Sequence, residues 1–99
     1  MSETRLSLGE IVVLEVLRRG TCQHGFQIKK SVDEILQHDR STAGIYMILR
    51  RLEKKSLASS KWEDGRNPEG ARRRLYHLTK EGRKTCDKMR EVLVAILAG

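Results

Sequence analysis

Apolar residues in the first part of the chain recur at the spacing of helices. Between Leu8 and Arg19 they occupy nearly the whole circumference of a helix, which predicts a helix buried on more than one side. Gly20 ends this helix. After a short turn at residues 21–25, we expect a second helix with a single apolar face made of Ile28, Val32, Ile35 and Leu36.

A third helix is expected from about residue 42 to residue 55, with Ser41 or Thr42 as its N-cap. At about 100° per residue, its two faces differ sharply. One face is apolar and consists of Ile45, Ile48, Leu49 and Leu52. The opposite face is largely cationic and consists of Ala43, Met47, Arg50 and Lys54, flanked by Tyr46 and Arg51. An exposed methionine is unusual on a face that meets only water, so we expect this face to contact a partner.

The later part of the chain predicts two strands and a last helix. Residues 57–62 and 72–78 follow strand patterns, and the turn-rich segment between them makes them a β-hairpin. Thr79 caps the last helix, which carries a broad apolar band of Met89, Val92, Leu93, Ile96 and Leu97. This band is larger than one small core requires. We therefore expect it to form a dimer interface together with Ile11 and Leu14 of the first helix.

The length and charge of the chain narrow its function. A chain of 99 residues predicts one domain over residues 1–99, without the second lobe of a large enzyme. The net charge is +7, and residues 40–90 hold fifteen Lys or Arg against six Asp or Glu. Such a one-sided basic zone suits a polyanion. The longest apolar run has seven residues where a membrane span needs about 20, so we expect a cytoplasmic protein without membrane contact.

No motif indicates a metal, a cofactor or catalysis. Cys22 and Cys86 lie far apart without a second pair that could close a zinc site, and their roles stay open. His24 is interpreted as a turn or cap residue, beside a glycine that permits a tight turn. Trp62 most simply packs into the base of the hairpin, although an aromatic near a dimer interface could also stack on a flat ligand.

The order of helices and strands predicts an α+β, mostly helical fold: a winged helix-turn-helix of three helices, a two-stranded hairpin wing and a C-terminal helix. In such modules the second helix of the pair lies in the major groove of double-stranded DNA. Candidate DNA contacts on or before the third helix are Ser41, Thr42, Tyr46, Met47, Arg50 and Arg51. Candidate contacts on the wing are Arg66, Arg72 and Arg73.

Four segments carry a resemblance to a known family: residues 6–11 (LSLGEI), 24–26 (HGF), 45–53 (IYMILRRLE) and 72–82 (RRRLYHLTKEG). Together they resemble the PadR family of winged-helix transcriptional regulators, in its short form without a separate C-terminal domain. The resemblance implies a homodimeric repressor whose terminal helices form the dimer, and which often answers to a small-molecule effector. In two places the chain departs from the family pattern. Gly44 stands where a hydroxyl is common, and Ser56 stands where a glycine is common after the recognition helix.

A second class of function stays open on the sequence alone. Winged helices also serve as protein-interaction modules, and Met47 with its cationic neighbours could bind an acidic protein. The operator sequence, the regulated genes, the effector and the direction of regulation cannot be inferred from these residues.

Overall fold

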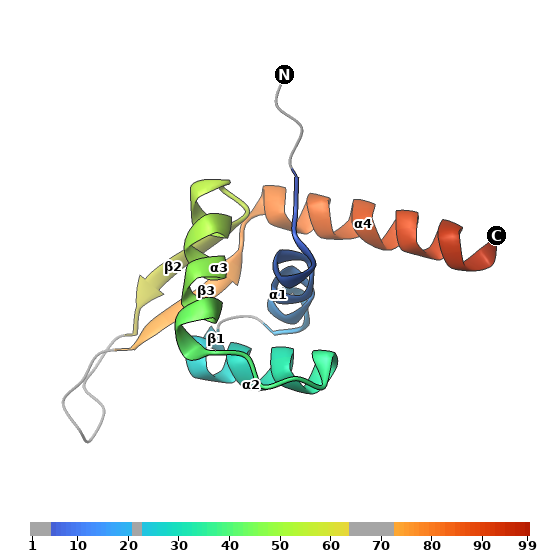
Figure 1. The fold of residues 1–99 in the computed structure, drawn as a ribbon. Coiled ribbons are helices and arrows are strands. Elements are labelled where there is room, and N and C mark those ends of the chain that lie inside the picture. The colour runs from blue at the N-terminus through green and yellow to red at the C-terminus, as the bar shows by residue number, and fades with distance from the viewer. Residues whose placement is uncertain (1–4, 21–22, 64–72) are drawn as a thin grey trace.

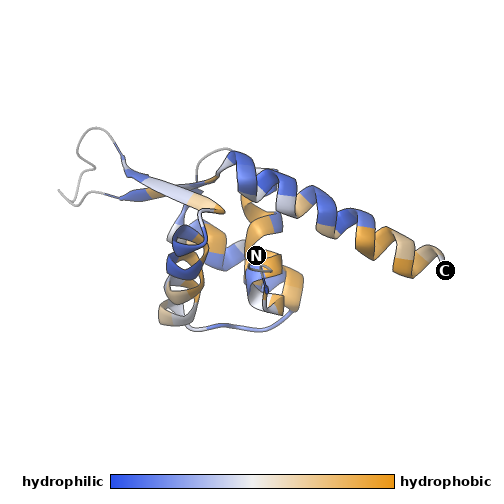
Figure 2. Cartoon of the chain, turned by 90° about the horizontal axis from the view of Figure 1, so that it is seen from above, coloured by the Kyte–Doolittle hydropathy of each residue, from blue (hydrophilic) through white to orange (hydrophobic). Residues whose placement is uncertain are grey.

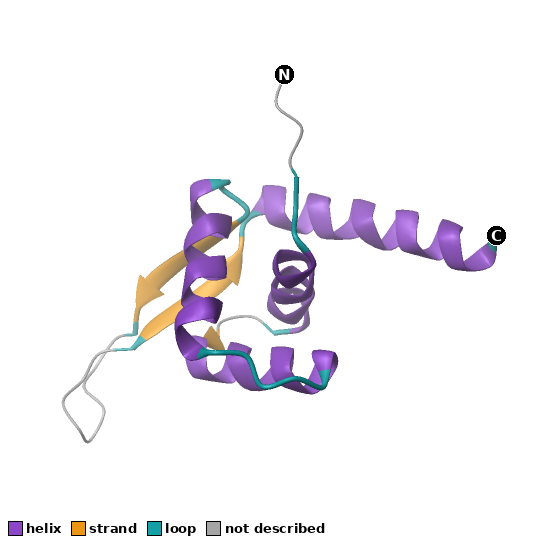
Figure 3. Ribbon diagram, in the orientation of Figure 1, coloured by secondary structure: helices purple, strands orange, loops and turns teal. Residues whose placement is uncertain are grey.

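The computed structural model describes residues 5–20, 23–63 and 73–99. Figures 1 and 3 show a group of helices with a small sheet on one side, and the last helix extending away from the other elements. In chain order the elements are α1 (Leu8–Arg19), β1 (Gln23–His24), α2 (Gly25–Leu36), α3 (Thr42–Lys54), β2 (Ala58–Trp62), β3 (Arg74–Leu78) and α4 (Lys80–Ala98).

The helix α1 forms the centre of the core. It packs against α2, α3, β3 and the first part of α4. Burial on several sides is therefore confirmed, and its fully or nearly fully buried apolar residues are Val12, Val13, Leu14, Val16 and Leu17. Its start is fixed by reciprocal hydrogen bonds: the Glu10 backbone N–H donates to Ser7 Oγ, and the Ser7 N–H donates to Glu10 Oε1.

The helices α2 and α3 form the expected helix-turn-helix pair. A buried apolar face on each packs against α1, and the face of α3 contains the four residues that its periodicity predicts. The turn between the helices is held by Asp33. Its carboxylate accepts a hydrogen bond from the Arg40 backbone N–H at 3.0 Å and forms an ion pair with Lys29 at 2.6 Å. This ion pair holds the pKa of the Asp33 carboxyl below its ordinary value.

The described sheet has three strands where two were expected. Its order is β1-β3-β2, with both pairings antiparallel, and β3 lies in the middle. The additional strand is only Gln23 and His24, which pair with Tyr76 and Leu75 in a segment we expected to be a turn. Two residues are too few to show the alternation that predicts a strand, so the sequence pattern does not predict β1.

The helix α4 divides into a packed half and an exposed half. Gly82 is buried against the chain, and a Cβ atom there would lie 1.9 Å from the Leu57 carbonyl oxygen. Cys86 is also buried, but every residue from Glu91 to Gly99 is exposed. In Figure 2 this last part of α4 is largely hydrophobic and projects away from the rest of the molecule.

One expected interface residue is corrected by the fold. Leu14 has no exposed surface, because it faces the core of its own chain and not the outer side of α1. It therefore cannot meet a partner chain without unpacking the core. None of the helices in the described residues combines the length and apolar content needed to span a membrane.

Candidate nucleic-acid interface

The outer face of α3 is exposed along its length. Met47 is 55% exposed and Tyr46 is 44% exposed. Arg50, Arg51 and Lys54 are also exposed, while the apolar face of the same helix is buried. Ser41 is the N-cap, and its Oγ accepts a hydrogen bond from the Gly44 N–H at 3.0 Å; Thr42 follows it on the surface. All six candidate residues on or before α3 are thus accessible.

No carboxylate of the described residues pairs with the cations on this face. Within the described residues, Arg50, Arg51 and Lys54 form no ion pair. The acid of the same helix, Glu53, instead accepts a hydrogen bond from Ser60 of β2 at 2.9 Å. An array of unpaired guanidinium and ammonium groups is able to bind phosphates or the acceptor atoms of guanine.

Lys55 at the end of α3 has a different role. Its Nζ lies 2.6 Å from Glu10 Oε2 and 2.7 Å from the Arg5 carbonyl oxygen. Glu10 is the buried charged residue of the described core. Burial alone would raise its pKa, but the hydrogen bonds from Lys55 and Ser7 outweigh burial and hold the pKa below its ordinary value. This ion pair anchors the C-terminus of α3 to the start of α1.

The wing arginines in the described residues divide into two kinds. Arg73 is exposed and forms no ion pair with the described residues. Arg74 is held in place, because its Nε donates to Ser60 Oγ at 2.7 Å and its guanidinium lies 5.3 Å from the centre of the Trp62 ring. Trp62 is half exposed and is not part of the buried core of the described residues. Arg66 and Arg72 lie outside the described residues.

A small cavity joins the start of α2 to α3 and the wing. It has a volume of about 210 Å³ and is lined by His24, Gly25, Phe26, Tyr46, Arg73 and Arg74. The Tyr46 ring packs on Gly25 so closely that a Cβ there would lie 2.5 Å from the Tyr46 hydroxyl oxygen. A side chain at Gly25 would therefore displace the Tyr46 ring, and Gly25 does not have the positive φ of the tight turn expected from the sequence. His24 is the N-cap of α2, as expected of a cap residue.

Phe26 is the residue that the sequence pattern missed. It is 74% exposed beside Tyr46 and Arg73. A single phenylalanine at the start of a helix belongs to no periodic set, so helical periodicity alone does not predict its position. A search for apolar residues off the predicted helix face would have singled it out.

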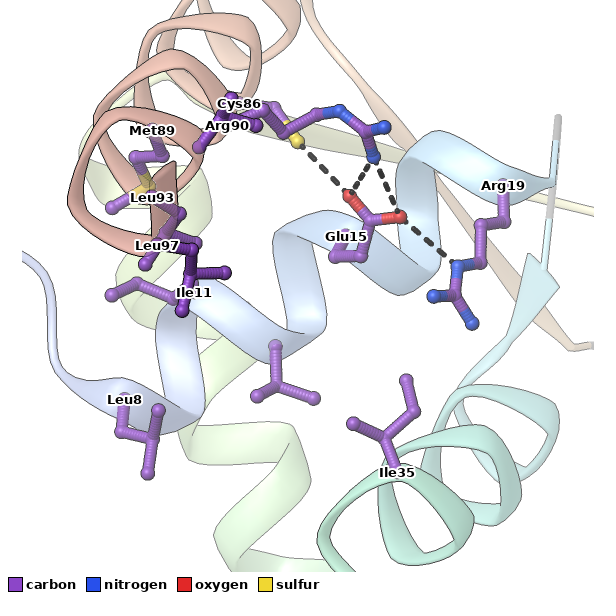
Figure 4. Close-up of a pocket in the computed structure, with 12 residues that line it drawn as sticks. Leu8, Ile11, Glu15, Arg19, Ile35, Cys86, Met89, Arg90, Leu93 and Leu97 are labelled. Atoms are coloured by element: carbon purple, nitrogen blue, oxygen red, sulfur yellow. Dashed lines mark hydrogen bonds and ion pairs between the residues drawn. The ribbon is translucent and has the colours of Figure 1, made fainter. Parts of the chain in front are cut away.

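A second hollow lies on the other side of the molecule, between α1 and α4. This groove of about 420 Å³ is mostly apolar, and Figure 4 shows Met89, Leu93 and Leu97 of α4 pointing toward Ile11 and Leu8 of α1. Of the expected interface residues, Ile11 and Met89 are partly exposed. The others except Leu14 are more open, with Val92 at 47%, Leu93 at 49%, Ile96 at 66% and Leu97 at 84% exposure.

Glu15 closes one end of the groove. Its carboxylate accepts from Arg18 at 2.8 Å, from Arg19 at 3.0 Å and from Arg90 of α4 at 3.2 Å. The pKa of Glu15 is lowered to about 2, mainly by the hydrogen bond from Arg18. Burial acts in the opposite direction, and the hydrogen bonds from Arg19 and Arg90 lower the pKa further. Glu15 thereby ties α1 to α4.

The Cys86 thiol donates to the same carboxylate at 3.7 Å. Burial, and then the charge of Glu15, raise its pKa, so the thiol is protonated and unreactive near neutral pH. Among the described residues, no cluster of histidines, cysteines or carboxylates could hold a metal ion. Cys22 lies outside the described residues.

Comparison with known families decides the identity of this fold. The family model described as the transcriptional regulator PadR-like family matches residues 13–88. The chain belongs to the PadR-like family of transcriptional regulators. Regulators of this family bind DNA and are not enzymes, so both expectations are confirmed at this level.

Solved structures of PadR-like and related regulators share the fold. RosR from H. salinarum is 22% identical, with a TM-score of 0.77, over 91% of this chain and 76% of its own. A PadR family transcription regulator from Clostridium difficile is 23% identical, with a TM-score of 0.69, over 94% of this chain and 100% of its own. BpsR from Bordetella bronchiseptica, whose DNA binding is regulated by 6-hydroxynicotinic acid, is 20% identical, with a TM-score of 0.74, over 99% of this chain and 67% of its own. A search of curated protein sequences finds no match.

The two departures from the PadR pattern have distinct structural settings. Gly44 lies in the first turn of α3, where a Cβ would come 2.9 Å from Ser41 Oγ. The hydroxyl groups near this point are therefore those of Ser41 and Thr42. Ser56 has a φ of 61°, in the left-handed region that favours glycine. The chain thus keeps the backbone turn associated with glycine but builds it with a serine.

Proposed function

We propose that this PadR-like protein is a repressor that recognises a specific duplex DNA sequence as a homodimer. In this proposal α3 lies in the major groove and the wing contacts the phosphate backbone. The observation that carries it is the outer face of α3, on which exposed Met47 lies among arginines that no described carboxylate neutralises. Water would solvate these cations equally well, but it would not favour the exposed Met47 among them, whereas DNA supplies phosphates, base edges and thymine methyl groups.

The residues on this interface have different proposed roles. Near the start and middle of α3, Ser41, Thr42, Tyr46, Met47 and Arg50 face the bases. Arg50 can donate to guanine acceptors, and the Met47 side chain can pack on a thymine methyl group. Arg51 and the wing residues Arg66, Arg72 and Arg73 bind phosphates, which positions the protein without reading sequence.

The dimer is proposed from the apolar surface of α4. The last turns of α4 expose Val92, Leu93, Ile96 and Leu97, and the groove beside Ile11 and Met89 offers an apolar surface for the same helix of a second chain. An isolated chain leaves this apolar surface in contact with water. Its burial against a second chain would stabilise the dimer by about 25 cal/mol per Å² of apolar area. Leu14 is not part of this proposal.

A small-molecule effector fits the same side of the molecule. The groove between α1 and α4 has a volume of about 420 Å³, which is within the usual range of about 300–1,000 Å³ for ligand sites. BpsR provides a precedent for an effector that regulates DNA binding on this fold. A ligand in the groove would change DNA affinity by changing how two α4 helices meet. The proposal keeps the cytoplasmic location expected from the sequence, because a repressor must reach DNA.

Selection of bound duplexes from a random pool, followed by titration at several salt concentrations, tests the DNA-binding part. The wild-type protein should select one sequence, and its affinity should fall with a slope of about −0.9 in log K against log salt for each phosphate it neutralises. Arg50→Ala should lose about 1–3 kcal/mol of discrimination at one base pair. Arg73→Ala should instead weaken all duplexes alike and make the slope shallower by about 0.9.

Lys88→Ala is the matched control, because it removes one exposed cation from α4, away from α3. It should leave the selected sequence and the discrimination unchanged. If the wild-type protein binds no duplex even at low salt, the proposal is wrong, and a role in binding an acidic protein becomes the better account.

A further inference from the structure

The cavity beside Tyr46 combines an apolar ring with an arginine that pairs with no carboxylate of the described residues. Phe26 leaves 74% of its surface exposed, although it lies next to the cationic face of α3. Arg73 lines the same cavity and forms no ion pair with the described residues, whereas the neighbouring Arg74 is committed to Ser60 and Trp62. A carboxylate lies at the edge, since Glu63 Oε1 is 3.6 Å from His24 Nε2.

The position of this cavity is fixed by the packing of Tyr46 on Gly25. Because the ring lies against the backbone at the start of α2, Tyr46 links the outer face of α3 directly to Phe26. The exposed surface of α3 and the cavity are therefore continuous. A ligand that covers Tyr46 and Arg50 reaches Phe26 by following the same surface toward the wing.

We propose that this cavity holds one sugar-phosphate unit of the DNA backbone, with Phe26 packed on the apolar edge of a deoxyribose and Arg73 paired with the adjacent phosphate. The inference rests on the proposed DNA-binding function and adds a backbone contact on α2, off the recognition helix. The charge of the cavity selects the occupant: an apolar ring beside an unpaired guanidinium suits a unit that is apolar at the sugar and anionic at the phosphate. Phe26 is a positioning contact and reads no base.

Three substitutions at Phe26 test the nature of the contact, using titration with a mixed-sequence duplex and with the selected operator. Phe26→Ala removes the apolar contact and should weaken both duplexes about fivefold, the effect of losing roughly 1 kcal/mol of apolar burial, without changing the salt slope. Phe26→Tyr keeps the ring and should bind like the wild type. Phe26→Lys places an ammonium where the backbone runs, so its slope should steepen by about 0.9 and its affinity at low salt should recover.

Thermal unfolding separates these effects from damage to the fold, because a side chain that is 74% exposed contributes little to the core. Glu63→Gln offers a test of opposite sign, since removal of this carboxylate beside the cavity should tighten binding to every duplex. If the wild type binds DNA and Phe26→Ala binds with unchanged affinity, the cavity contact is wrong while the proposed function stands. If Phe26→Lys loses binding as Phe26→Ala does, the occupant is not DNA backbone. If the wild type binds no duplex, both proposals fall.

Discussion

The helix α1 and the second half of α4 both have strongly apolar sequences but opposite surroundings. In α1 most apolar residues are covered by α2, α3, β3 and the packed half of α4, and Leu14 and Val13 have no exposed surface. In the last turns of α4 the apolar residues are only partly covered by their own chain, with Leu93 49% and Leu97 84% exposed. Apolar character alone therefore does not tell which surface is core and which is interface.

The difference follows from the position of each helix in the chain. The elements α2, α3 and β3 fold back onto α1, whereas α4 continues past the edge of the core. The ion pair between Arg90 and Glu15 marks that edge. Stability of the single chain should thus depend on α1 and on the first half of α4, while the second half of α4 serves association.

Replacing one leucine in each helix by alanine should distinguish these two roles, and it has the largest expected effect of the changes considered. Leu14→Ala leaves a cavity in the core and should lower the free energy of unfolding by about 2–5 kcal/mol. Leu97→Ala should leave the unfolding of the dilute monomer nearly unchanged, since its side chain is exposed there. Urea unfolding measures the first effect, and sedimentation equilibrium measures the dimer that Leu97→Ala should weaken.

Protein concentration provides the control for this pair. Because association stabilises the folded state by mass action, the wild type should become more stable as its concentration rises, and Leu97→Ala should respond less. Equal losses of stability in the two variants under dilute conditions would contradict the comparison of α1 with α4.

The sequence predicts best where a helix has one buried face. In α3 the period of the apolar residues places Ile45, Ile48, Leu49 and Leu52 in the core and Met47 outside, as the structure has them. In α1 the apolar residues surround the helix, so the pattern cannot say which side faces the core. The pattern places both Leu14 and Ile11 in an interface for that reason, whereas in the structure Leu14 is buried and Ile11 is partly exposed at the groove.

The remaining features depend on contacts between distant residues. Glu10 pairs with Lys55, which is 45 positions away in the sequence, so no local pattern predicts this ion pair. The spacing of Ser7 and Glu10 indicates only a capping box. The strand β1 exists only because β3 lies beside it, and Phe26 gains a role only because Tyr46 packs on the adjacent Gly25. Such features require the fold, because each residue is ordinary in its own segment.

Acid should weaken the ion pair of Glu15 that joins α1 to α4. We expect its effect on the free energy of unfolding to be smaller than that of Leu14→Ala. The pKa of Glu15 is about 2 in the folded chain, well below its ordinary value of 4.5, so its ionised form stabilises the fold. This contribution is present above about pH 4.5 and is lost as the pH falls toward 2, which corresponds to no more than about 3 kcal/mol. The free energy of unfolding, measured by urea titration across this range, should therefore decrease on acidification.

Glu15→Gln isolates this effect from Glu10 and Asp33, whose pKa values are also lowered. The variant should be less stable than the wild type at pH 7 and should approach it near pH 2. A constant difference between the two proteins at every pH would show that Glu15 acts by packing and not by charge.

The smallest expected effect lies away from both helices and tests whether the fold can be stabilised without touching association. Ser56 holds a φ of 61°, which costs a non-glycine residue about 1–2 kcal/mol, and glycine returns part of this through its greater freedom in the unfolded chain. Ser56→Gly should therefore raise the free energy of unfolding by about 0.5–1 kcal/mol, or the melting temperature by a few degrees. The Thr79 hydroxyl can still donate to the backbone carbonyl of residue 56, as it does at 2.6 Å.

Ser59→Gly is the matched control, because residue 59 lies in β2 and gains nothing from a left-handed backbone. It should lower the melting temperature, since glycine weakens a strand. Dimerisation measured by sedimentation should be the same in both serine variants and in the wild type. A lower melting temperature for Ser56→Gly would mean that the serine side chain stabilises this turn by more than its backbone strain costs, and that the departure from the family's glycine is an adaptation of this chain.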